Sequence, residues 1–526
     1  MLLKKLMLGA SFAALGATSA MADYSLTVLH TNDFHARFEP ISRFDSGCSA
    51  EDNMAGECFG GSARLITAVA EARARSNNSI LVDGGDQFQG TLFYTYYKGA
   101  MAAEFMNLLG YDAMTVGNHE FDDGPEVLRG FMDAVNFPVL LSNADYSGEP
   151  LLSDKLVKSV VIERGGERIG LIGLTPDDTD ELASPGPNVI FTDPADAVAS
   201  EVASMEEMGV NKIIVLSHSG YAVDMAVAAA NPSVDVIVGG HTNTYLNSND
   251  EDADGPYPTM VGTTAIVSAY AYGKYLGELN VTFDDNGVIT EASGGPLIMD
   301  GNVAEDEAAV ERIAELAVPL DEIRNRVVAE AAEAIDGDRA NCRARECQMG
   351  NLVADAMLDR VAGQGVTIAI QNGGGVRASI DEGEVTMGEV LTVLPFQNTL
   401  ATMQLTGADV IAALENGVSQ VEEGAGRFPQ VAGVTFTFDP TVAPNEGRVG
   451  DVMVKDGDNW VPIDPEAIYG VVTNNYMRGG GDGYATFAQN AINPYDFGPN
   501  LEEVVAAYMA ANAAYQPYLD GRISER

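Results

Sequence analysis

The five histidines of this 526-residue chain constrain its fold more than any other feature. Four of them follow short apolar runs typical of strands, and a further run ends on two aspartates. The runs are LTVLH with TNDFH (His30, His35), SILVDGGDQ (Asp83, Asp86), AMTVGNHEFD (His119), IIVLSHSG (His218) and DVIVGGH (His241). Because the carboxyl ends of parallel strands share one edge of a sheet, polar residues at several such exits indicate a ligand site there. The pattern predicts an α/β enzyme with a dinuclear metal site.

The order of elements predicts two domains. From residue 24 to about residue 300, strand-like runs alternate with helical stretches at 61–75, 100–109 and 195–208, which is the spacing of βα units. Residues 303–334 are rich in Ala and Glu and predict a helical connector, or alternatively a surface helix of the first domain. Their apolar positions at helical spacing are Val310, Ile313, Leu316, Leu320, Ile323 and Val327. We expect a catalytic domain over 23–306, a helical linker over 307–325 and a C-terminal α/β domain over 326–526.

Residues 1–22 have the pattern of a removable signal peptide. Lys4 and Lys5 precede an apolar stretch over 6–17, and the tripeptide AMA at 20–22 fits a cleavage site. The apolar stretch is short for a membrane span, and the C-terminal DGRISER lacks the hydrophobic tail of a lipid-anchor signal. We predict a periplasmic or secreted protein that begins at Asp23 and has no membrane anchor.

The charge is strongly acidic, with a formal net charge of −48 at pH 7. Loss of Lys4 and Lys5 with the signal peptide would lower it by two more. Such a balance argues against binding to nucleic-acid polymers or anionic membranes, because polyanions would be repelled. An anionic substrate must therefore be held by a few well-placed cations. The sequence makes no prediction of oligomeric state.

Four cysteines form two local pairs, Cys48 with Cys58 and Cys342 with Cys347. The alternatives are a metal site or free thiols. The even count, the predicted export and the absence of cysteine from the histidine motifs favour two structural disulfides.

The residues at the strand exits suit metal ligation. Asp33 and His35 stand two apart in a loop and can both turn toward one cation, while the carboxylate of Asp86 could bridge two cations. Further nitrogen and oxygen donors that would complete a second coordination sphere are Asn118, His218 and His241. Such mixed donors suit Zn²⁺, Mn²⁺ or Co²⁺. A pair of these ions can activate a water for in-line displacement at phosphorus.

The motif GNHEFDDG contains a second pair of interest, His119 and Asp122. A carboxylate that accepts a hydrogen bond from one imidazole nitrogen fixes the tautomer and favours the charged ring. The other nitrogen could then meet developing charge on phosphate. His119 is therefore predicted to be catalytic, with metal ligation as the main alternative, and His30 is predicted to be structural.

The C-terminal part offers residues for substrate binding. Arg343 lies between the second pair of cysteines and Arg377 follows the turn NGGG, where a planar guanidinium suits phosphate. Phe396 and Tyr476 are candidate aromatic faces for a base, although isolated aromatics in such runs more often belong to the core.

The ordered motifs HTNDFH, DGGDQFQG, VGNHEFD, SHSG and GGHTN resemble the calcineurin-like metallophosphoesterases, specifically the secreted 5′-nucleotidase family. CRARECQMGNL, NGGGVR, LPF and GGGDGY resemble the C-terminal substrate-binding domain of that family, so the resemblance spans nearly the whole chain after the signal peptide. It implies an N-terminal metallophosphoesterase α/β sandwich, a helical linker and a C-terminal α/β substrate-binding domain.

The resemblance also implies a role for each site residue. One ion would be bound by Asp33, His35 and Asp86, with Asn243 nearby. The other would be bound by Asp86, Asn118, His218 and His241. His119 and Asp122 would form the catalytic dyad. Phe396 and Tyr476 would enclose a nucleobase, although phenylalanine is more usual than Tyr476. Phosphate and ribose would contact Arg343, Asn372 and Arg377, and the ribose hydroxyls would contact Asp482.

The implied function is hydrolysis of nucleoside 5′-monophosphates such as AMP by a hydroxide that two metal ions activate. Both cysteine pairs resemble those of the animal ecto-5′-nucleotidases, which favours a monophosphate substrate. The alternatives on the same site are a UDP-sugar hydrolase or a 2′,3′-cyclic nucleotide phosphodiesterase. A further alternative is a non-catalytic nucleotide-scavenging receptor, which would not need the pair of His119 and Asp122.

Overall fold

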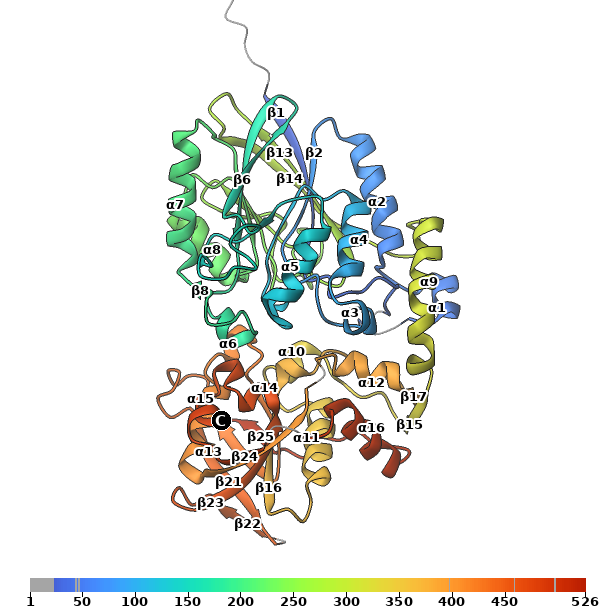
Figure 1. The fold of residues 1–526 in the computed structure, drawn as a ribbon, viewed down its shortest axis with the longest axis vertical. Coiled ribbons are helices and arrows are strands. Elements are labelled where there is room, and N and C mark those ends of the chain that lie inside the picture. Colours follow the sequence, from blue (N-terminus) through green and yellow to red (C-terminus); the bar gives the residue numbers. More distant parts are fainter. Residues whose placement is uncertain (1–22, 43–44, 46–47, 397, 458, 496–497) are drawn as a thin grey trace, which may run out of the picture.

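The computed structural model describes residues 23–526 except 43–44, 46–47, 397, 458 and 496–497. The predicted signal peptide, residues 1–22, lies outside the described part. Figure 1 shows two halves, with the blue-to-green N-terminal half above the orange-to-red C-terminal half. Helix α9 (Glu307–Arg324) runs along one side and leads from the first half to the second.

Two six-stranded sheets form the N-terminal half. The first has the order β14-β13-β1-β2-β3-β4, in which β1 to β4 are parallel to one another and β13 and β14 are antiparallel additions. Its strands are β1 (Tyr24–Thr31), β2 (Ser79–Asp83), β3 (Ala113–Thr115), β4 (Val139–Leu140), β13 (Tyr275–Phe283) and β14 (Ile289–Ile298).

The second sheet has the order β11-β12-β10-β9-β7-β6, with β7, β9, β10 and β12 parallel. Its strands are β6 (Ser159–Arg164), β7 (Glu167–Leu174), β9 (Ile213–Ser217), β10 (Val236–Val238), β11 (Thr259–Val261) and β12 (Thr264–Val267). A small pair, β5 (Ala144–Asp145) and β8 (Ile190–Phe191), lies apart from both sheets.

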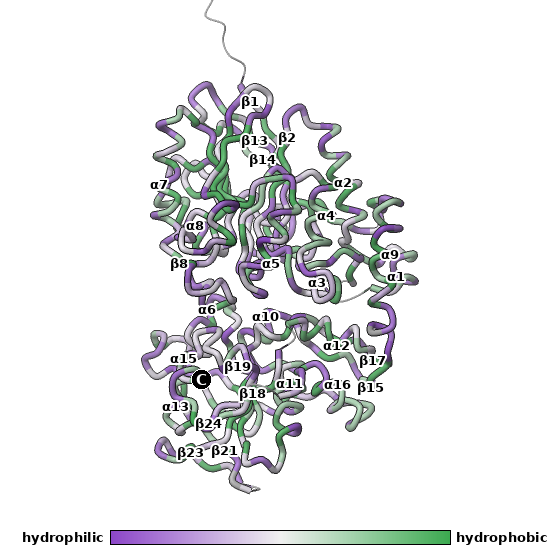
Figure 2. The backbone as a smooth tube through the Cα atoms, viewed as in Figure 1, coloured by the Kyte–Doolittle hydropathy of each residue, from purple (hydrophilic) through white to green (hydrophobic). Residues whose placement is uncertain are grey.

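The central strands β2, β3, β9, β10 and β12 read as short apolar runs because both of their faces are buried, whereas the edge strands β6, β11 and β14 are partly exposed. Along β1, Leu26 and Val28 point into a core shared with the second sheet, while Leu29 packs toward helices on the other face. In Figure 2 green segments gather in the middle of this half, as expected for a buried core between the sheets. The helices of this half are α1 (Ala50–Ala55), α2 (Ser62–Arg75), α3 (Leu92–Tyr97), α4 (Ala100–Leu109), α5 (Gly124–Ala134), α6 (Thr179–Leu182), α7 (Pro194–Glu207) and α8 (Tyr221–Ala230), with the 3₁₀ turn η1 (His119–Phe121).

The C-terminal half is built on a five-stranded sheet, β19-β16-β23-β18-β24, and a four-stranded sheet, β22-β21-β20-β25. Their strands are β16 (Val366–Asn372), β18 (Leu400–Thr406), β19 (Pro429–Ala432), β20 (Val434–Phe438), β21 (Val449–Asp456), β22 (Asn459–Pro462), β23 (Ile468–Asn474), β24 (Ile492–Tyr495) and β25 (Ile523–Glu525), beside the pair β15 (Val327–Ala331) and β17 (Gly383–Thr386). The helices are α10 (Arg339–Cys342), α11 (Gln348–Arg360), α12 (Met387–Val393), α13 (Gly407–Gly417), α14 (Asn475–Arg478), α15 (Ala485–Gln489) and α16 (Leu501–Ala511), with 3₁₀ turns η2 (Gly373–Gly375), η3 (Val421–Glu423) and η4 (Gly481–Gly483).

The sequence located several elements closely. The predicted helical stretches at 61–75, 100–109 and 195–208 correspond to α2, α4 and α7, and 307–324 forms α9. The assignment of Val327 to the helical pattern is wrong, because α9 ends at Arg324 and Val327 begins β15. Asn325 caps the helix, and a strand residue two positions later can match helical spacing by chance.

The two predicted disulfides, Cys48–Cys58 and Cys342–Cys347, are both present. Among the described residues, no helix combines the length and the apolar character needed to cross a membrane.

Candidate metal centre and substrate site

The exits of the parallel strands bring the predicted ligands together from both sheets. Asp33 and His35 follow β1, Asp86 follows β2, and Asn118 and His119 follow β3. From the second sheet, His218 follows β9 and His241 follows β10. Five of these residues form two overlapping clusters that could each hold a metal ion, namely His35, Asp86 and His119, and Asp33, Asp86 and His218.

Asp86 lies at the centre of this arrangement. Its Oδ2 is 2.9 Å from Nε2 of His218, 3.8 Å from Nε2 of His35 and 3.9 Å from Nε2 of His119. Two glycines let its loop come close to the loop after β3. Gly85 has a φ of +92°, and a Cβ on Gly117 would lie 2.2 Å from Oδ1 of Asp86. Asp86 can therefore face both clusters at once.

Hydrogen bonds at Nδ1 orient the rings of His35 and His218 so that Nε2 of each faces the aspartates. Nδ1 of His35 lies 3.0 Å from the carbonyl of Phe88, and Nδ1 of His218 lies 2.6 Å from the carbonyl of Gly84. Because a carbonyl oxygen accepts, each Nδ1 donates, and in the neutral ring the lone pair of Nε2 faces the aspartates. A cation between these lone pairs and carboxylates fits the donor set.

The charges of the cluster support the same conclusion. Burial lowers the pKa of His218, but the carboxylates of Asp86 and Asp33 outweigh it and raise this pKa to about 10. A divalent cation would supply the positive charge that this proton otherwise provides. Oδ1 of Asp33 and Oδ1 of Asn243 are buried without a hydrogen-bond partner in the described part of the chain, as expected of oxygens that ligate an ion.

Five of the predicted ligands have backbones in the left-handed region of φ/ψ space. They are Asp33 (φ 49°), His35 (φ 51°), Asp86 (φ 60°), His241 (φ 72°) and Asn243 (φ 51°). Asp, Asn and His tolerate this region better than other residues with a Cβ, but each such residue is still held there at a cost. The surrounding loops therefore impose the positions of these side chains.

His119 is oriented as a catalytic dyad requires. Its Nδ1 lies 2.7 Å from Oδ2 of Asp122, and its backbone N–H donates to Oδ1 of Asp86 over 2.9 Å. Burial lowers the pKa of His119, but Asp122 and Asp86 outweigh it and the pKa is raised. A ring that carries its proton can donate from Nε2, which faces the clusters, to a bound anion.

Glu120 is a site residue that the sequence reasoning missed. It is fully buried, and its carboxylate accepts from the backbone N–H groups of Asp86, Gln87, Phe88 and Gly117 at 2.7–3.2 Å. These donors belong to the loops after β2 and β3. Glu120 thus ties the loop of Asp86 to the loop of Asn118, and its place inside GNHE was the available signal.

Side chains of the C-terminal half reach the clusters directly. Nη2 of Arg377 lies 3.2 Å from Nε2 of His35, and the ring of Phe396 stacks on His119 with 5.5 Å between centroids and 17° between planes. The guanidinium of Arg377 also lies over the ring of Phe396, 5.5 Å from its centroid. The two halves therefore face each other across the candidate metal centre.

Arg339 is a second residue that the sequence reasoning missed. It donates from Nη2 to the carbonyl of His241 over 2.7 Å. Burial lowers the pKa of Arg343 well below its usual value, and the positive charges of Arg339 and Arg377 lower it further. None of the three forms an ion pair with a carboxylate among the described residues, so they make a positive patch that suits an anion. The four-residue spacing of Arg339 and Arg343 was the available signal.

The other predicted substrate residues lie together behind this patch. Asn372 ends β16, Tyr476 lies in α14 and Asp482 lies in η4, and the three side chains are joined by hydrogen bonds. Turn η4 packs against α6 of the N-terminal half, and Arg427 pairs with Asp178 across the same boundary over 3.8 Å.

His30 lies apart from the clusters, within β1. Its Nε2 is 2.8 Å from the hydroxyl of Tyr257, and complete burial lowers its pKa to about 3. This position supports the structural role expected from the sequence.

The low pKa of His30 predicts a stability that falls in acid. The folded pKa lies below the unfolded value of about 6.5, so this contribution is complete above pH 6.5 and is lost as the pH falls toward 3. Between pH 6.5 and pH 5 we expect wild type to lose about 2 kcal/mol more unfolding free energy than His30→Gln. Urea unfolding with EDTA, followed by circular dichroism, measures this. Equal pH dependence in both proteins would contradict the assignment.

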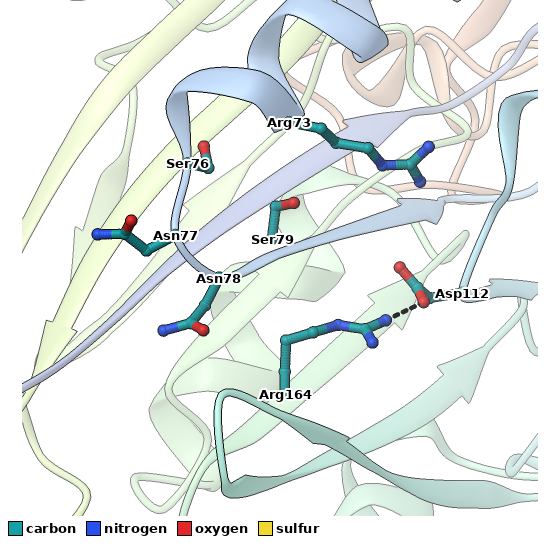
Figure 3. A pocket seen from close by; sticks show the side chains of 7 residues that line it. All are labelled: Arg73, Ser76, Asn77, Asn78, Ser79, Asp112 and Arg164. Carbon is teal, nitrogen blue, oxygen red and sulfur yellow. Dashed lines mark hydrogen bonds and ion pairs between the residues drawn. The ribbon is translucent and has the colours of Figure 1, made fainter.

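A cavity of about 410 Å³ at the opposite edge of the sheets does not belong to this site. Figure 3 shows that Arg73 and Arg164 line it beside Ser79, the first residue of β2. Arg73 donates to the carbonyls of Leu109 and Gly110, and Arg164 pairs with Asp112. These contacts join α2 to the end of α4, and the end of β6 to the residue before β3.

Clusters of aspartate, histidine and asparagine at the strand exits of a two-sheet α/β sandwich define a metal-dependent phosphoesterase. Residues 26–245 match the model of the calcineurin-like phosphoesterases, and residues 327–489 match that of the 5′-nucleotidase C-terminal domain. The 5′-nucleotidase of Diplobatis ommata is 38% identical over 528 residues, covering 95% of this chain and 90% of the relative, and that of Homo sapiens is 36% identical over 538 residues, covering 97% and 93%. The chain therefore belongs to the 5′-nucleotidase family.

The structural comparison agrees with this assignment. The structure of a 5′-nucleotidase precursor from Thermus thermophilus superposes with a TM-score of 0.90 at 41% identity, covering 95% of this chain and 99% of that chain. The chain is a metal-dependent hydrolase of phosphoric monoesters, and its fold is the predicted metallophosphoesterase half followed by a 5′-nucleotidase C-terminal half.

Proposed function

We propose that this chain hydrolyses nucleoside 5′-monophosphates, AMP among them, to the nucleoside and phosphate. The observation that carries the proposal is the contact of two predicted substrate-binding residues, Arg377 and Phe396, with the candidate metal cluster. Arg377 lies 3.2 Å from His35, and Phe396 stacks on His119. A phosphate bound at the cluster would meet a guanidinium, and the rest of the nucleotide would extend into the C-terminal half.

The proposed ligands would divide between two ions, and Asp86 would belong to both sets. Asp33, His35 and Asn243 would complete one set, and Asn118, His218 and His241 the other. Zn²⁺, Mn²⁺ and Co²⁺ suit these nitrogen and oxygen donors. Two such ions, when bound, activate water for in-line displacement at phosphorus and neutralise phosphoryl oxygens.

The chain itself contributes orientation and a proton. Asp122 holds the imidazole of His119 so that Nε2 can donate to a phosphoryl oxygen as charge develops on it. Arg343 and Arg377, with Arg339 beside them, would hold the phosphate in line. In a protein with a formal net charge of −48, this patch directs an anionic substrate to the site.

Export and domain organisation are part of the same proposal. Residues 1–22 would be a signal peptide, and the protein would act in the periplasm or outside the cell. Relatives include proteins named snake venom 5′-nucleotidase, from Gloydius brevicauda for example. Residues 23–306 would form the catalytic domain, 307–325 a linker that permits hinge motion, and 326–526 the nucleotide-binding domain.

A substrate panel tests the proposal. With Mn²⁺, Co²⁺ or Zn²⁺ supplied, we expect kcat/KM for AMP to exceed the values for ATP, UDP-glucose and 2′,3′-cAMP at least about tenfold. Phosphate release measures turnover, and metal analysis of protein purified without chelators identifies the ions. If kcat/KM were higher for UDP-glucose or 2′,3′-cAMP than for AMP, that compound would be the better substrate and the proposal of a 5′-monophosphate would be wrong. Nucleotide binding without phosphate release would favour the receptor alternative.

A further inference from the structure

The carboxylate of Asp482 is held by hydrogen bonds at both of its oxygens. Oδ1 accepts from the hydroxyl of Tyr476 over 3.1 Å, and Oδ2 accepts from Nδ2 of Asn372 over 2.6 Å. Asp482 is buried, at 5% exposure, and lies in turn η4 on the boundary with the N-terminal half. Its orientation is therefore fixed before any substrate arrives.

Tyr476 and Asp482 form a reciprocal pair. The tyrosine hydroxyl donates to Oδ1 of Asp482 and accepts from the backbone N–H of Asp482, again over 3.1 Å. Asp482 needs this support because its backbone is left-handed, with φ 56° and ψ 29°. Burial and the charge of Asp482 raise the pKa of Tyr476 well above 10, so the hydroxyl keeps its proton and donates. A phenylalanine here could form neither bond.

Buried side-chain amides fix the orientation of Asn372, which is the partner of Oδ2 of Asp482. Oδ1 of Asn372 accepts from Nδ2 of Asn474 over 3.0 Å and from Nε2 of Gln371 over 3.1 Å. All three amides are less than 5% exposed. Because Oδ1 of Asn372 is occupied in this way, its Nδ2 is committed to Asp482.

Both oxygens of Asp482 still have an acceptor position. Each carboxylate oxygen offers about two lone-pair sites, and the residues that the structure describes use one site on each. Two neighbouring hydroxyls of a ribose present two donors at a spacing that the two oxygens of one carboxylate can accept together. We propose that Tyr476 is a positioning residue whose hydroxyl aligns Asp482 with the 2′- and 3′-hydroxyls, so that the enzyme selects ribonucleotides over deoxyribonucleotides. This inference rests on the proposed function.

The test compares Tyr476→Phe with wild type on three substrates. AMP has both hydroxyls, 2′-deoxy-AMP has one and 2′,3′-dideoxy-AMP has none. We expect Tyr476→Phe to lower kcat/KM about tenfold for AMP, mainly through KM, because a charge-assisted bond loses its geometry. The loss should be smaller for 2′-deoxy-AMP and less than twofold for 2′,3′-dideoxy-AMP, since the aromatic face is retained.

Two further variants sharpen the comparison. Tyr469→Phe removes a tyrosine hydroxyl elsewhere in the same half, one that accepts from the backbone of Asp464, and should leave all three substrates unchanged. In Asp482→Asn, adding Tyr476→Phe should cost AMP hydrolysis less than twofold, because the group that the hydroxyl positions has already changed.

Equal losses on AMP and 2′,3′-dideoxy-AMP would overturn the inference, and so would an unchanged value for AMP. A wild-type protein that hydrolyses no 5′-monophosphate would refute the proposed function instead. In that case the inference is tested by calorimetry, which measures the affinity of wild type and Tyr476→Phe for adenosine and for 2′,3′-dideoxyadenosine. Weaker binding of adenosine alone supports the alignment of Asp482, and equal effects on both ligands refute it.

Discussion

Asp86→Asn should lower kcat/KM for AMP at least about 10³-fold, because one neutral amide replaces the carboxylate that faces both clusters. Oδ2 of Asp86 lies within 3.9 Å of Nε2 in His35, His119 and His218. Asparagine keeps the size of the side chain but removes its charge and one acceptor. Metal analysis should show fewer than two tightly bound ions per chain, and the activity loss should persist at saturating Mn²⁺.

A matched control is Asp133→Asn, which makes the same change at a half-exposed aspartate paired with Arg129 and Lys155. It should retain wild-type activity and metal content. An Asp86→Asn protein that bound two ions and turned over AMP near the wild-type rate would contradict the role of Asp86 as the shared ligand.

His119→Ala should lower kcat about 10²–10⁴-fold and leave the metal content unchanged. The ring is held by Asp122 at 2.7 Å, and its Nε2 is directed toward the clusters. Removing it takes away the proton donor and leaves the predicted ligands in place. Asp122→Asn should cause a smaller loss of kcat, because the ring remains but its orientation and charge are weakened.

Metal analysis separates this result from the main alternative. If His119 were a ligand, His119→Ala would lose one ion, and added Mn²⁺ would restore part of the activity. His30→Gln is the histidine control. His30 lies in β1, is hydrogen-bonded to Tyr257 and should be dispensable for turnover.

The sequence predicted which residues of the N-terminal half lie together, because strand exits are short and regular. Asp33, Asp86 and His218 each stand within three residues of a strand end, so parallel strands alone bring them to one edge. The alternation of helical stretches with strand-like runs also predicted α2, α4 and α7. These features depend on local sequence and on one topological rule.

The contacts between the halves could not be derived in this way. Phe396 stacks on His119, and Arg339 donates to the carbonyl of His241. These contacts depend on how the two halves pack, and the residues that meet are far apart in the sequence. Glu120 was missed for another reason. Its carboxylate binds backbone N–H groups, which every residue except proline has, so its partners leave no mark in the sequence.

The candidate metal centre has a cost in stability because five of its residues have left-handed backbones, namely Asp33, His35, Asp86, His241 and Asn243. Glycine would adopt those conformations with less strain, yet it would remove the donor atom. At these five predicted ligand positions, a substitution that relieves backbone strain would therefore also remove the predicted ligand atom. Directed evolution that selects only for heat resistance should therefore accumulate substitutions at these five positions. Selection that also requires phosphate release should keep the present residues.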